Sequence, residues 1–139
     1  MKRRDAIFER LALKEKLFIN QQMRSVGALN SELQKLQEMR VKLGDMAAEL
    51  SSKTQEQTAF TLRSSAALNY QIREQLETAS NRSEYLSEEL QSMRHKIALS
   101  NRRREKSTSK AERIRRTSRY EREARCDDDD ASRRKSCPR

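Results

Sequence analysis

The side chains that could do chemistry are few and lie far apart along the chain. His95 is the only histidine, and no second ligand or nucleophile stands at helical spacing from it. Cys126 and Cys137 flank four consecutive aspartates at 127–130, which lack the spacing of a specific cation site. Catalysis needs convergent groups in a dry pocket. We therefore expect free reduced thiols, no metal, no cofactor and no enzymatic activity.

Basic side chains are the one chemical group that the chain concentrates. The net charge is +10, and residues 102–139 contribute +7 of it, with 15 basic and 8 acidic side chains. On a helix, steps of three and four residues would place one set of cations on a single face. We call this set the basic ridge: Arg103, Lys106, Lys110 and Arg113. Such a ridge favours an acidic protein surface, nucleic acid or an anionic membrane, and charge alone does not choose among them.

Two sets of mostly apolar residues at heptad spacing predict the helices that carry these side chains. We call each set a stripe, and the line along which the two stripes would pack against each other the seam. The first comprises Val26, Leu29, Leu33, Leu36, Leu43 and Leu50. The second comprises Ile72, Leu76, Ala79, Ser83, Leu86, Leu90, Met93 and Ile97. The second stripe is displaced by one residue from the continuation of the first, which is about 100° around a helix. A turn within 51–58 resets this phase, whereas one straight helix would have to twist sharply.

The predicted fold is therefore all-α: a long antiparallel two-helix coiled-coil hairpin with a basic helical C-terminal extension. The hairpin covers residues 1–101, the basic helical extension 102–125 and a disordered tail 126–139. With 34% hydrophobic and 4% aromatic residues, the chain is too polar for a thick globular core but sufficient for a thin seam between two helices. No run approaches the roughly 20 apolar residues that span a bilayer. We expect a cytoplasmic protein, or one peripheral to the inner face of the cell membrane.

The antiparallel alignment of the two stripes has two solutions. One places Leu36 opposite Leu76 and Leu33 opposite Ala79, and the other is shifted by one heptad. The turn carries no glycine or proline to fix the choice. Residues near the N-terminus have a broader apolar face than a two-helix seam needs. These residues, which either cover the far end of the second helix or await a partner, are Ile7, Leu11, Leu13, Leu17 and Phe18.

One short stretch, Leu68-Asn69-Tyr70-Gln71 followed by Leu76 and Ala79, resembles a known family. It is similar to the apolar-Asn-Tyr-Gln stretch near the start of the second helix in the FliJ family of flagellar export chaperones. Length, basic character and the order of helices are also similar to that family. The aromatic and isoleucine that the family has after the glutamine are replaced here by Ile72 and Arg73.

The resemblance implies a non-enzymatic component of flagellar or type III protein export. It would act as a coiled-coil stalk and chaperone that engages the export ATPase ring, the cytoplasmic domain of the export gate and other export chaperones. The gate-facing patch that the resemblance implies comprises Asn69, Tyr70, Ile72, Leu76 and Ala79. Because the seam would bury Leu76 and Ala79, we expect Tyr70 and Arg73 to carry more of any contact. The basic ridge would dock on an acidic surface of the ring. The alternative is a nucleic-acid-associated or structural coiled coil that binds through its basic C-terminal segment.

Overall fold

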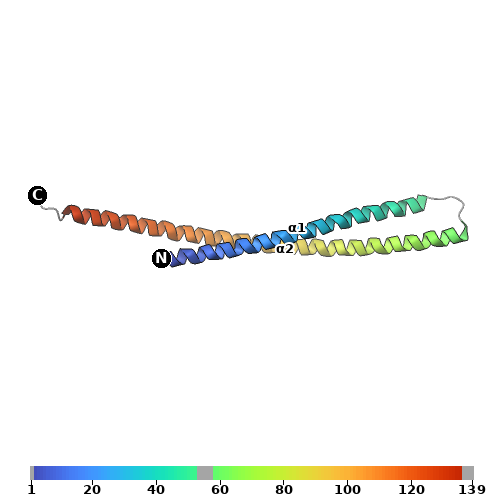
Figure 1. Cartoon of the computed structure of the whole chain (residues 1–139), viewed down its shortest axis with the longest axis horizontal. Helices are drawn as coiled ribbons and strands as arrows, with labels where there is room; N and C mark the ends of the chain where they lie inside the picture. Colours follow the sequence, from blue (N-terminus) through green and yellow to red (C-terminus); the bar gives the residue numbers. More distant parts are fainter. Residues whose placement is uncertain (1, 53–57, 136–139) are drawn as a thin grey trace. The chain divides into compact units, whose positions relative to one another are not determined.

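Two long helices make up the computed structural model, which describes residues 2–52 and 58–135 (Figure 1). Helix α1 spans Lys2–Ser52 and helix α2 spans Ala59–Lys135. Neither helix contains a proline, and α1 continues through both of its glycines. Asp5 in the first turn of α1 complements the positive end of the helix dipole. Thr58 directly precedes α2, and its carbonyl oxygen accepts the backbone N–H of Leu62 at 3.0 Å.

The predicted all-α helical hairpin is confirmed, because the two helices pack against each other. Of the predicted turn at 51–58, residues 51 and 52 end α1, Thr58 precedes α2, and 53–57 lie outside the described residues. The predicted disorder from Cys126 is wrong as far as Lys135, where α2 ends. Asp129 and Asp130 stand four residues before Arg133 and Arg134, a spacing that supports a helix and offsets the repulsion among the aspartates. Residues 136–139, with Cys137, lie outside the described residues.

The chain divides into two compact units. The central unit is Gln22–His95, and the terminal unit combines Met1–Gln21 with Lys96–Arg139. In each unit a stretch of α1 packs against a stretch of α2 that runs in the opposite direction. The central unit buries residues of both predicted stripes, and Leu86 is fully buried. Burial of one such leucine contributes roughly 1.5 to 3 kcal/mol. The buried apolar residues of this unit are Leu43, Ile72, Ala79, Leu86 and Leu90.

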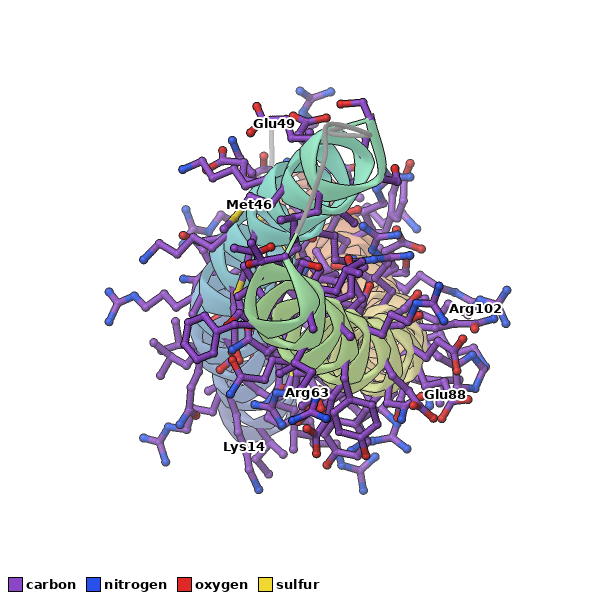
Figure 2. All side chains as sticks on the ribbon, turned by 90° about the vertical axis from the view of Figure 1, so that its right-hand side faces the viewer. Lys14, Met46, Glu49, Arg63, Glu88 and Arg102 are labelled. Atoms are coloured by element: carbon purple, nitrogen blue, oxygen red, sulfur yellow. The ribbon has the colours of Figure 1, made fainter. Side chains whose placement is uncertain are left out.

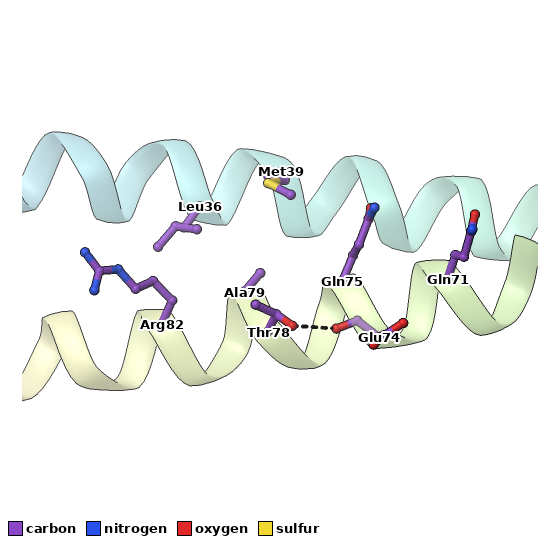
Figure 3. Close-up of a pocket in the computed structure, with 8 residues that line it drawn as sticks. All are labelled: Leu36, Met39, Gln71, Glu74, Gln75, Thr78, Ala79 and Arg82. Atoms are coloured by element: carbon purple, nitrogen blue, oxygen red, sulfur yellow. Dashed lines mark hydrogen bonds between the residues drawn. The ribbon is translucent and has the colours of Figure 1, made fainter.

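The register of the central unit differs from the first of the two alignments considered above. Figure 3 shows Leu36 of α1 lying between Ala79 and Arg82 along α2. The prediction that Leu36 stands opposite Leu76 is therefore wrong. Relative to that alignment, Leu36 lies opposite residues further along α2, short of Ser83, which a shift of one full heptad in this direction would place opposite it. A slide of one heptad keeps both stripes facing each other, so the apolar pattern alone discriminates weakly between the two registers.

Contacts in the terminal unit are displaced in the same direction. The Nζ atom of Lys110 lies 5.5 Å from the centre of the Phe8 ring. The first alignment, continued to this end of the chain, would have placed Phe8 near Arg104 instead. The one-heptad alternative places Phe8 opposite Ala111, and Ala111 is indeed buried. The alternative register therefore accounts for the contacts at this end of the two helices.

The seam of the terminal unit extends past Ile97, where the apolar repeat in the sequence stops. Ser100 and Ala111 are each only 3% exposed. Together with the half-buried Arg104 and Ser107, they continue the steps of three and four residues along α2. The serine and alanine side chains are small enough for close approach of the helices. The segment 102–125 is thus helical as predicted, but its first part packs against α1 instead of extending beyond the hairpin.

Candidate functional site

The four side chains of the basic ridge are all exposed and follow one line along α2 in the terminal unit. Arg103 and Arg113 are ten residues apart, which on a helix corresponds to about 15 Å. Within the described part of the chain, none of the four forms an ion pair, and Lys110 lies over the Phe8 ring. The ridge therefore presents four cations on a helix that packing against α1 already holds in place.

A different basic residue, Arg115, pairs with the two acidic residues near the start of α1. Its guanidinium forms ion pairs with Glu9 and, at 3.8 Å, with Asp5. Lys110 and Arg115 are five residues apart, about 140° around α2, so they lie on opposite flanks of the seam. The acidic groups near the start of α1 are thus engaged on one flank, while the ridge lies on the other. This separation leaves the ridge with an uncompensated positive field.

A ridge of exposed cations of this kind can bind anions. An arginine guanidinium binds a carboxylate or phosphate through two parallel hydrogen bonds, whereas a lysine acts as a point charge. Each exposed ion pair contributes only about 0 to 1 kcal/mol. Specific binding therefore needs several of the four cations together, which requires a partner with an extended negative surface.

The predicted gate-facing patch belongs to the central unit and is only partly accessible. Ile72 and Ala79 are each 3% exposed, and Asn69 and Leu76 are half-buried. Tyr70, by contrast, is 69% exposed, and its neighbour Arg73 is also exposed. Of the six residues, only Tyr70 and Arg73 can make extensive contact with another molecule while the seam stays closed.

A shallow groove of about 500 Å³ lies between the helices in the central unit (Figure 3). Leu36 and Met39 line it from α1, and residues between Gln71 and Arg82 line it from α2. The Thr78 hydroxyl donates to the Glu74 carbonyl oxygen at 2.9 Å. The Thr78 hydroxyl is thus engaged with a backbone carbonyl of its own helix.

Arg82, which lines one end of this groove, forms hydrogen bonds with a carboxylate of α1. Arg82 donates to Oε1 of Glu32 through Nε at 3.3 Å and through Nη2 at 3.0 Å. The same guanidinium lies 5.6 Å from the centre of the Tyr85 ring. Arg82 therefore links α1 to α2, and its guanidinium is occupied by contacts within the chain.

Metal-binding and membrane-spanning features are absent from the described residues. No group of three or more histidine, cysteine, aspartate or glutamate side chains there could hold a metal ion. Neither helix has an apolar stretch of the length and hydropathy needed to cross a bilayer, within the ranges 2–52 and 58–135.

The apolar pattern of the sequence missed one feature of the terminal unit and left a second one open. One is the continued seam, whose signal is the unbroken alternation of three and four residues through Ser100, Arg104, Ser107 and Ala111. The other is the accessibility of the apolar residues near the N-terminus, for which the sequence left two outcomes open. In the structure they do not cover α2, because Ile7, Leu13 and Leu17 are each more than half exposed.

Comparison of the chain with protein-family models, with characterised proteins and with solved structures found no match.

Proposed function

We propose that this chain is a non-enzymatic coiled-coil adaptor whose basic ridge docks on an acidic protein surface. The observation that carries the proposal is the row of four exposed cations, none of which has an ion-pair partner among the described residues. Packing of α2 against α1 supports it further, because a ridge held on a packed helix loses little conformational entropy on binding.

The resemblance to the FliJ family supports a specific process for this adaptor. It would act as a stalk and chaperone in flagellar or type III protein export. The ridge would engage acidic side chains of the export ATPase ring. Tyr70, the accessible member of the gate-facing patch, and its exposed neighbour Arg73 would contact the cytoplasmic domain of the export gate or other export chaperones. The chain would act in the cytoplasm or at the inner face of the cell membrane.

The experiment that tests the proposal measures binding of the full chain to the export ATPase ring of the same organism. A variant with all four ridge residues changed to glutamate should lose at least about tenfold in affinity, because several weak pairs are removed and repulsion is added. The matched control changes four exposed cations of the central unit, Lys35, Lys42, Arg63 and Arg94, to glutamate. This control has the same net charge and should bind within about twofold of the unchanged chain, apart from long-range attraction that salt screens.

A nucleic-acid function is the competing outcome of the same experiment. Phosphate contacts alone would make binding to a DNA duplex strong and steeply dependent on salt. If the unchanged chain prefers DNA to the ring at physiological salt, or if the ridge variant binds the ring as well as the unchanged chain, the export function is rejected.

A further inference from the structure

Helix α1 carries an unusual density of exposed apolar side chains near its start. Five large residues within 7–18 are between 38% and 61% exposed. Soluble proteins scatter single apolar residues over their surface, whereas a contiguous group marks an interaction site. We call this group the outer face: Ile7, Leu11, Leu13, Leu17 and Phe18.

The seam of the terminal unit does not use the outer face. Phe8, Ala12 and Ile19 are the apolar residues of this stretch that lie on the side of α1 toward α2, with Ile19 only 8% exposed. At 100° per residue, the outer face covers about 160° of the helix on the side away from these three. The five apolar residues can therefore contact another surface without opening the hairpin.

The charged residues of this stretch are sorted by sign around the helix. Arg10 and Lys14 fall within the outer face and are exposed, and Lys14 extends away from the helices in Figure 2. Asp5 and Glu9 are directed toward Arg115 on another side. Glu15 lies at a seam position and is half-buried. The outer face thus combines apolar side chains with positive charge and contains no acidic residue.

The breadth of this face favours a lipid surface over a partner helix. A helix packed in a coiled coil covers a narrow apolar stripe, and it would bury Arg10 and Lys14 along with the leucines. At a bilayer surface, a broad apolar face enters the boundary between headgroups and acyl chains. Lysine and arginine stems lie along that face while their cations reach the headgroup phosphates.

We infer that the outer face of α1 binds the surface of an anionic lipid bilayer, with the helix lying in the plane of the headgroups. The two exposed cations, Arg10 and Lys14, supply attraction to anionic lipids. This membrane contact goes beyond the proposed protein partner and does not depend on it, since the two use different residues.

Flotation of the full chain with lipid vesicles tests the inference. Vesicles of phosphatidylcholine alone are compared with vesicles that also contain phosphatidylglycerol. The apolar variant is Leu13→Gln with Leu17→Gln, and its control is Met39→Gln with Met46→Gln, two exposed apolar residues of the central unit. The charge variant is Arg10→Glu with Lys14→Glu, and its control is Lys35→Glu with Lys42→Glu.

The unchanged chain should float with the anionic vesicles and not with the neutral ones. Each outer-face variant should lower the partition coefficient by at least about tenfold, while both controls stay within about twofold. Circular dichroism should report unchanged helicity for all four variants, because every altered side chain is exposed. Equal binding to neutral vesicles, undiminished binding of the apolar variant, or an equal loss in the controls would overturn the inference. Binding of the same apolar variant to the export ATPase ring is measured separately, and it tests the proposed function and not the membrane contact.

Discussion

Nε of Arg115 lies 3.8 Å from Oδ2 of Asp5, so a residue of the basic C-terminal segment is paired with the first turns of the chain. The same guanidinium pairs with Glu9, one turn further along α1. The other oxygen of Asp5, Oδ1, is buried and has no hydrogen-bond partner. Electrostatic contacts thus add to the packing of the seam in holding the start of α1 against α2.

Changing Arg115 to glutamine should loosen the start of α1. The side chains of Arg115 and Glu9 are about half exposed, so the loss of stability should be small, on the order of 1 kcal/mol. Hydrogen exchange of the amides of residues 6–14 should become faster, and high salt should produce the same change in the unchanged chain. Arg82→Gln, which removes the exposed pair with Glu32, serves as the control and should leave these amides unaffected. Exchange that is identical in both variants would contradict the assigned role of Arg115.

A carboxylate at the fully buried Leu86 should unfold the central unit. Leu86→Asp removes the burial of a leucine and adds the cost of placing a charge in the seam, a total of several kcal/mol. The matched control is Val41→Asp, at a position that is 59% exposed. Thermal melting followed by circular dichroism should show a large loss for the first variant and almost none for the second. Equal melting temperatures would mean that the buried face has been assigned to the wrong side of α2.

The seam of small side chains in the terminal unit should not tolerate a large residue. Ala111 is 3% exposed, and Ala111→Phe should cost about 1 to 3 kcal/mol through overpacking. Limited proteolysis should then cut more rapidly within residues 6–20. Ala124→Phe is the control, because Ala124 is exposed on the same helix. If both variants resist cleavage as well as the unchanged chain, α2 does not pack on α1 at Ala111.

The helices and the basic ridge could be predicted from the sequence, because steps of three and four residues directly encode a helix face. The terminal seam could not be predicted from apolar residues, since Ser100 and Ser107 occupy seam positions without being apolar. The register was left between two solutions because one heptad of Leu and Ala resembles the next, and no turn residue discriminates between them. The helix beyond Cys126 was missed because the aspartates were considered without the basic residues four positions later.

Whether α2 packs on the start of α1 within one chain is measured most directly by the distance between Lys16 and Thr108. These exposed positions lie one heptad inward from Glu9 and Arg115 on their respective helices. Spin labels would be attached at both positions after Cys126 and Cys137 are replaced by serine. Packed helix axes are 8 to 10 Å apart, so an intramolecular hairpin should give one narrow distance distribution below about 25 Å. This distribution should persist when labelled chains are diluted with unlabelled ones. A broad distribution at longer distances, or a short distance that disappears on dilution, would contradict the intramolecular hairpin that holds the basic ridge in place.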